Sequence, residues 1–188
     1  MANPWSQVPA TCFNPVRFIP PSRQQTILAF QVDSISVAAH EKTPWGKGFT
    51  NHWCLYLRTS QNPSIQINCQ PSYSVPGTVI PGGSKAFVII SELSYDPSHD
   101  AVKDVSLTVR PGLTVAHVVN SLIASGRHKY EFNQQGVGCR SWVTDQVNIL
   151  LEQQYAVDGE QCETARQAIL KLWPDGTQLG LDTGAYYQ

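Results

Sequence analysis

A cysteine and a histidine are the residues of this chain whose types and neighbours could carry covalent chemistry. Cys139 follows two glycines, Gly136 and Gly138, and opens an amphipathic run that continues to Leu151. This pattern predicts a thiol at the N-terminus of a helix, where unpaired backbone N–H groups and the positive end of the helix dipole favour the thiolate. His52 opens a strand-like run far upstream. Together the two residues could form a Cys–His nucleophilic site.

Two alternating runs, 52–58 and 64–69, predict a β-hairpin with one polar face. Their apolar side chains align if the numbers of paired residues sum to about 122. That register puts several side-chain amides on the same face as His52. These amides belong to Gln66, Asn68 and Gln70.

Asn68 is the candidate third member of the site. Its amide could orient the imidazole and hold its tautomer, and Gln66 and Gln70 are rivals for that role. An asparagine at a strand end is also an ordinary turn former. Nucleophilic catalysis requires the Cys139 sulfur to lie within about 4 Å of a His52 ring nitrogen.

Further side chains are candidates for contact with a substrate. Arg140, next to the cysteine, could hold a substrate carboxylate through a bidentate contact, although an arginine at a helix start is more often solvated. Trp142, Tyr56 and Tyr130 could line a pocket, although core packing is the ordinary role of buried aromatic residues. Gln66 and Gln70 are the remaining predicted substrate contacts.

The order of the predicted elements favours an α+β domain. Strands are predicted at 26–32, 35–39, 52–58, 64–69, 85–93 and 105–109, with a short extended segment at 129–132. Loops are predicted at 40–51 and 71–84. Helices are predicted at 115–124, from residue 139 to about 151, and at 160–172. Strands first and helices later indicate an antiparallel sheet with about three helices packed on one side.

The length of 188 residues suits one domain. Prolines concentrate in residues 1–24, which we expect to be an extended arm. Residues 25–173 would form the domain and 174–188 a polar, aromatic tail.

Composition narrows the class of partner. Thirteen Lys and Arg residues against 14 Asp and Glu residues give a formal net charge of -1, which argues against a nucleic acid or an anionic membrane surface as partner. No stretch has the length of a membrane span, and a signal peptide is not evident. We therefore expect a cytoplasmic protein with five free cysteines, a small-molecule substrate, and no metal or other cofactor.

The motifs also resemble a known superfamily. The run from His52, the segment Asn68-Cys69-Gln70-Pro71 and the later Cys139 resemble circularly permuted papain-like proteins of the NlpC type, in the lecithin-retinol acyltransferase-like branch. That resemblance implies a permuted papain-like fold and a Cys–His–polar catalytic set. Two positions depart from the family: Gly138-Cys139-Arg140-Ser141-Trp142 replaces Asn-Cys-x-x-Phe, and Asn68 stands where the family usually has His. The His-Trp and Gly-Cys-Arg-x-Trp motifs also resemble a group of small fungal proteins, some of them associated with secondary metabolism.

Three hypotheses about function remain open at this stage. The first is a thiol-dependent hydrolase or acyltransferase acting on an ester, thioester or amide of a small molecule. The second is a non-thiol cyclase, isomerase or small-molecule-binding protein on the same scaffold, with His52 at most an acid or base. The third is a structural homodimer module, in which the arm and tail serve the interface.

Overall fold

The computed structural model describes residues 13–45, 48–60, 64–95 and 100–188. Its strands are β1 (Val16–Ile19), β2 (Val32–Trp45), β3 (Gly48–Thr59), β4 (Ser64–Pro76), β5 (Ser84–Leu93), β6 (Lys103–Thr108), β7 (Tyr130–Phe132), β8 (Lys171–Leu172), β9 (Thr177–Gln178) and β10 (Ala185–Tyr186). Within the described residues, eight strands form one sheet in the order β10-β7-β5-β4-β3-β2-β6, with β1 pairing beside β5. Strands β8 and β9 form a separate pair.

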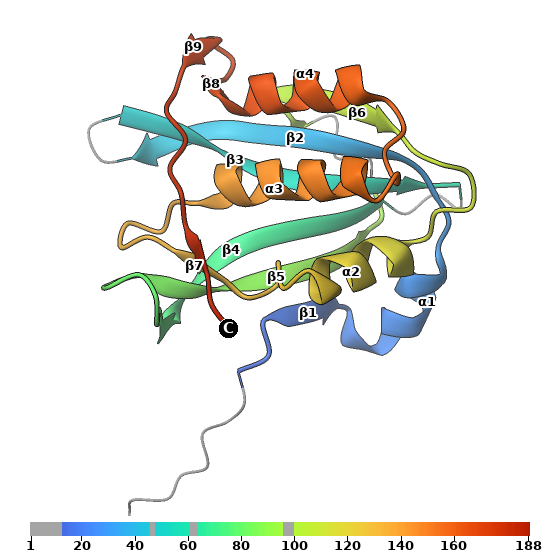
Figure 1. Cartoon of the computed structure of the whole chain (residues 1–188), viewed down its shortest axis with the longest axis horizontal. Helices are drawn as coiled ribbons and strands as arrows, with labels where there is room; N and C mark the ends of the chain where they lie inside the picture. The colour runs from blue at the N-terminus through green and yellow to red at the C-terminus, as the bar shows by residue number, and fades with distance from the viewer. Residues whose placement is uncertain (1–12, 46–47, 61–63, 96–99) are drawn as a thin grey trace, which may run out of the picture.

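Helices cover one face of this sheet. They are the 3₁₀ helix η1 (Pro21–Arg23) and the α-helices α1 (Gln24–Ala29), α2 (Val115–Ala124), α3 (Cys139–Glu152) and α4 (Gly159–Ile169). Figure 1 shows α2, α3 and α4 lying side by side across the same face, with α3 over the middle strands. The predicted α+β class, an antiparallel sheet with helices packed on it, is confirmed.

Alternation along the strands explains why one face is covered. Leu55, Ile67 and Val88 point into the core and are fully or almost fully buried, as are Val143 and Val147 of α3. Burying a side chain of this size contributes about 1.5–3 kcal/mol. The hairpin register follows the prediction, since Leu55 pairs with Ile67. The polar amides of β4 therefore lie on the face away from the helices.

Several predicted boundaries were wrong. The segment 26–32 was expected to be a strand, but 24–29 is the short helix α1, which buries Ile27. The helix expected at 160–172 ends at Ile169 because Lys171 and Leu172 pair with β9. Each of these segments is short enough for its tertiary contacts to override its local pattern.

Strand extends into both predicted loops. Most of 40–51 belongs to the β2–β3 hairpin, which pairs as far as Trp45 and Gly48, with a register shift between Ala39 and Lys42. Much of 71–84 belongs to β4, which continues to Pro76. Prolines are tolerated in this stretch because one edge of β4 lacks a neighbouring strand there.

Strands β3 and β4 separate beyond their short ladder. Among the described residues, their pairing runs from Arg58 opposite Ser64 to Leu55 opposite Ile67 and goes no further toward the start of β3. Beyond Leu55, β3 stays paired with β2, while β4 stays paired with β5. A gap therefore opens in the middle of the sheet, and the N-terminus of α3 lies at this gap.

Both chain ends of the described structure contact the domain. Strand β1 adds to β5 in parallel, with Arg17 opposite Ile89. Strand β10 pairs with β7 and crosses near the start of α3 (Figure 1). The boundaries drawn at residues 24 and 174 therefore fall within segments that pack on the sheet or the helices. None of the helices in the described ranges is long and apolar enough to cross a membrane.

Candidate functional site

The start of α3 places Cys139 at the gap between β3 and β4. The N-cap residue Gly138 has φ +151°, a conformation that L side chains rarely adopt. No side chain caps α3, whereas Thr114 caps α2 and Asp158 caps α4. The first-turn N–H groups of α3 therefore remain available to an incoming acceptor. Cys139 Sγ lies 4.0 Å from the carbonyl oxygen of Asn51, the residue before His52.

The imidazole of His52 lies between Cys139 and Asn68. Its Nε2 is 2.8 Å from Asn68 Oδ1, and the amide oxygen accepts the Nε2–H hydrogen bond. The thiols of Cys139 and Cys54 also interact electrostatically with this ring. Since Nε2 donates to Asn68, Nδ1 is the ring nitrogen that remains available to a thiol. The three residues predicted as a catalytic set are thus brought together at the gap between β3 and β4.

Residues from both faces of the sheet come together at this gap. Cys139 belongs to the helix-side core, whereas Asn68 lies on the opposite face, where it pairs with Ile89 of β5. A continuous sheet would separate them. The gap between β3 and β4 lets the thiol reach His52 from the helix side.

Electrostatics favour an ion pair between the two reactive groups. Burial raises the pKa of the Cys139 thiol, but the hydrogen bond and the positive charge of His52 outweigh it, so the pKa lies below its ordinary value. Burial lowers the pKa of His52, but hydrogen bonds with Cys139 and Cys54 outweigh it and hold this pKa well above the ordinary value. Both shifts favour a thiolate and an imidazolium.

Cys139 and His52 line an open cavity of about 690 Å³. This size is within the range of small-molecule sites. The cavity is bounded by the loop before α3, the separated parts of β3 and β4, and side chains of β5, β2 and β1. Gln70 lines it, together with Phe87 and Ile89.

Tyr56 and Gln66 lie beside the site without lining this cavity. Gln66 Nε2 donates to Tyr56 Oη at 2.9 Å and lies 3.7 Å from Cys54 Sγ. Tyr56 Oη is 2.6 Å from His40 Nε2. These two residues form a partly buried polar cluster with His40 next to Cys54.

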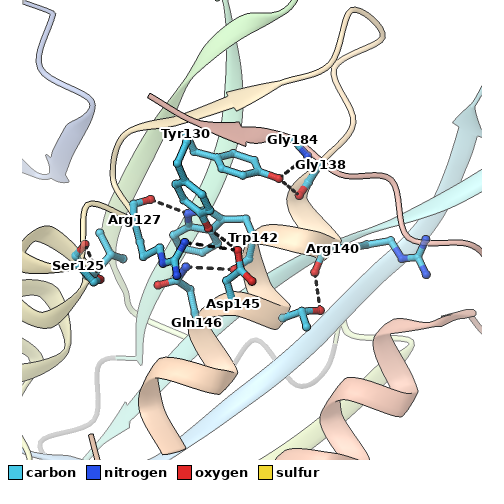
Figure 2. Close-up of polar contacts among 12 residues, drawn as sticks. Ser125, Arg127, Tyr130, Gly138, Arg140, Trp142, Asp145, Gln146 and Gly184 are labelled. Atoms are coloured by element: carbon cyan, nitrogen blue, oxygen red, sulfur yellow. Dashed lines mark hydrogen bonds and ion pairs between the residues drawn. The ribbon is translucent and has the colours of Figure 1, made fainter. Parts of the chain in front are cut away.

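Arg140 does not line the cavity that holds Cys139 and His52. The residue is 1% exposed. Its guanidinium donates to the carbonyl oxygens of Ile169, Leu179 and Gly180. Figure 2 shows this side chain extending away from Trp142, toward the C-terminal segment. It therefore fastens that segment to α3.

Tyr130 and Trp142 are buried and do not line this cavity either. Tyr130 Oη donates to the Gly138 carbonyl at 3.0 Å and accepts from Gly184 N–H at 2.8 Å (Figure 2). Trp142 is fully buried and donates its indole N–H to the Arg127 carbonyl at 2.8 Å. Tyr130 therefore supports the loop that positions Cys139.

The sequence did not point to several residues that line the cavity. Tyr73 packs against Gly136, where an added Cβ would lie 2.7 Å from its hydroxyl oxygen. Arg17 enters from β1. The alternation of Val16–Ile19 hints at a strand, but its parallel partner β5 lies too far along the chain to be recognised from sequence. In the described part of the chain, no three His, Cys, Asp or Glu side chains cluster as metal ligands would.

Comparisons with known proteins give one family match. Neither the curated proteins nor the solved structures include a match to this chain. The match to the family covers residues 35–187, from β2 through β10, and so includes His52, Asn68 and Cys139. Because this match spans most of the chain, the protein belongs to the family described as Domain of unknown function (DUF7770).

Proposed function

We propose that this protein is a thiol-dependent hydrolase or acyltransferase for an ester, thioester or amide of a small molecule. One observation carries the proposal: His52 donates to Asn68 and interacts electrostatically with Cys139, and the cysteine and histidine line one cavity. A buried structural cysteine needs neither a lowered pKa nor a ligand-sized cavity.

The arrangement supports a two-step reaction. The Cys139 thiolate attacks the carbonyl carbon, and the carbonyl π electrons move to oxygen to give a tetrahedral oxyanion. This intermediate collapses, the bond to the leaving group breaks, and His52 Nδ1–H supplies the proton that the leaving group needs. Water or an acceptor nucleophile then attacks the acyl-enzyme, His52 takes its proton, and Cys139 leaves as the thiolate.

Donors for the oxyanion are at hand in the cavity. The uncapped first turn of α3 offers backbone N–H groups next to the thiol. Gln70 adds a side-chain amide from β4. Removing one such donor in a hydrolase typically reduces kcat by about 10²–10³.

Trapping the acyl-enzyme tests the proposal. The protein is mixed with the pentanoyl thioester of N-acetylcysteamine, quenched in acid and digested. Mass spectrometry should find a pentanoyl group on the Cys139 peptide, and Cys139→Ala should lose both the adduct and the turnover. Cys162→Ala is the matched control, because Cys162 is a buried thiol of α4 outside the cavity.

The non-thiol hypothesis makes the opposite prediction. If turnover of a substrate survives Cys139→Ala but not His52→Ala, the site acts by acid–base chemistry alone and the thiol mechanism is wrong. The same conclusion follows if the acyl group is found on other cysteines at equal rates.

A further inference from the structure

Arg17 stands out among the residues that line the cavity. Among the described lining residues, it is the only one from the Lys, Arg, Asp and Glu types. Its guanidinium carbon lies 3.4 Å from the centroid of the Phe87 ring, which also lines the cavity. No carboxylate in the described chain pairs with it. A cation that has no carboxylate partner among the described residues thus lines the same cavity as the thiol.

The stacked geometry leaves this guanidinium ready to bind an anion. Stacking on an aromatic ring uses the flat face of the group and holds its plane. The N–H donors lie along the edge, where a carboxylate can accept two parallel hydrogen bonds. Phe87 therefore positions Arg17 without occupying its donors.

The sheet register places Arg17 at a distance from the thiol that a substrate can span. Arg17 pairs with Ile89, and Ile89 pairs with Asn68 on the other edge of β5. Adjacent strands are about 4.8 Å apart, so Arg17 lies roughly 10 Å from Asn68 across the sheet. His52 contacts Asn68, and Cys139 lies next to His52. An anion bound at Arg17 would thus be several bonds away from the carbonyl under attack.

We propose that the substrate carries a carboxylate, several carbons from the scissile carbonyl, which Arg17 binds. This inference rests on the thiol-dependent function proposed above and names its substrate class. The carboxylate belongs either to the acyl group or to the leaving thiol, and the two sources are distinguished by the test.

Paired thioesters test the acyl side. N-acetylcysteamine thioesters of glutarate, adipate and suberate are compared with those of pentanoate, hexanoate and octanoate, which have the same chain lengths without the charge. We expect Arg17→Gln to lower kcat/KM for the best carboxylate substrate roughly tenfold to hundredfold, as for loss of a charge-assisted contact. The kcat/KM for the neutral thioesters should change less than twofold. Arg17→Lys should retain part of the preference for the carboxylate thioesters.

A second pair tests the leaving group. The octanoyl thioester of 3-mercaptopropionate carries its carboxylate on the thiol and is compared with the octanoyl thioester of N-acetylcysteamine. In either comparison, a loss of kcat/KM in Arg17→Gln that is confined to the carboxylate substrate supports the proposal. Lys85→Gln controls for net charge, since Lys85 stacks on Tyr187 and does not line the cavity.

Two results would overturn the inference. One is that Arg17→Gln lowers kcat/KM equally for charged and neutral thioesters. The other is that Lys85→Gln lowers kcat/KM for the charged thioesters as much as Arg17→Gln does. Calorimetric titration with adipate separates this inference from the proposed function. If no thioester acylates Cys139 but adipate binds and binds at least tenfold more weakly to Arg17→Gln, the thiol mechanism fails and the anion site stands. If adipate binds both proteins equally, the anion site is wrong.

Discussion

The imidazole of His52 donates a hydrogen bond from one of its two nitrogen atoms, Nε2, to Asn68. We expect the other nitrogen, Nδ1, to exchange a proton with the sulfur of Cys139 and with the leaving group. An amide can orient the ring in this way without carrying a charge of its own. We therefore expect Asn68 to be a positioning residue, whose loss affects turnover more than stability.

Replacing Asn68 tests this positioning role. We expect Asn68→Ala to lower kcat/KM for thioesters roughly tenfold to hundredfold, because the ring loses its fixed tautomer. Asn68→Asp keeps an acceptor and should recover most of the activity. Gln66→Ala is the matched control, since Gln66 carries the same kind of side chain on the same face of β4 but donates to Tyr56. Equal losses in Asn68→Ala and Gln66→Ala would mean that the amide acts through the fold alone.

At the scale of elements, the site depends on how α3 begins. Gly138 adopts a φ of +151°, and a Cβ there would lie 3.1 Å from Tyr130 Oη. The hydroxyl of Tyr130 in turn holds the Gly138 carbonyl. The helix start is thus fixed by backbone conformation and by packing, and Cys139 is the first residue after it.

Gly138→Ala should disturb both stability and the site. We expect a loss of about 2–3 kcal/mol in the free energy of unfolding, from strain at positive φ together with the tight contact to Tyr130. Gly126→Ala separates the two causes, because Gly126 has φ +71° with nothing within 4 Å of the added Cβ. Denaturant unfolding should show a loss nearer 1 kcal/mol for Gly126→Ala, with unchanged thioester turnover. Similar losses of stability and turnover in both variants would contradict this account of the α3 start.

At the scale of the whole molecule, the C-terminal segment closes the structure over α3. Arg140 donates to the carbonyl oxygens of Ile169, Leu179 and Gly180, and Tyr186 donates to Asp145 of α3 at 2.7 Å. These contacts are buried or half-buried, so each unsatisfied group left behind is costly.

Removing the guanidinium should therefore be strongly destabilising. We expect Arg140→Met to lower the free energy of unfolding by about 3 kcal/mol, because three carbonyl oxygens lose their donor. Arg166→Met is the control, since Arg166 pairs with Glu163 on the surface of α4, where such pairs contribute about 0–1 kcal/mol. Denaturant unfolding measures both variants. A loss below 1 kcal/mol for Arg140→Met would show that the segment is held by other contacts.

Local patterns in the sequence predicted the parts of the molecule that repeat over several residues. The alternation of β3 and β4 gave their register, and the apolar spacing of α2 gave its bounds. That register also put Asn68 on the face of His52. The register could not predict the gap between β3 and β4. The gap arises because β3 stays paired with β2 while β4 stays paired with β5.

Side-chain roles were harder to predict than elements. Arg140 and Trp142 stand next to the cysteine in sequence, yet a helix turns successive residues by about 100°, so they point into other surroundings. Arg17 lies far from Cys139 in sequence and reaches the cavity through a parallel pairing that leaves no local signal. Neighbours in sequence were therefore poor guides to the cavity, and the sheet register was a better one.

The central claim is that His52 holds Cys139 as a reactive thiolate, and the pH dependence of alkylation tests it most directly. Iodoacetamide is added over a range of pH, and peptide mass spectrometry assigns the rate to each of the five cysteines. Because the pKa of Cys139 is lowered and that of His52 is raised, Cys139 should react fast at neutral pH, with a midpoint below the roughly 8.5 of a free thiol. In His52→Ala, the two largest contributions that lower the Cys139 pKa are lost while burial remains, so the midpoint should rise and the neutral rate should fall at least tenfold. A slow Cys139 in the parent protein, or a profile unchanged by His52→Ala, would contradict the claim.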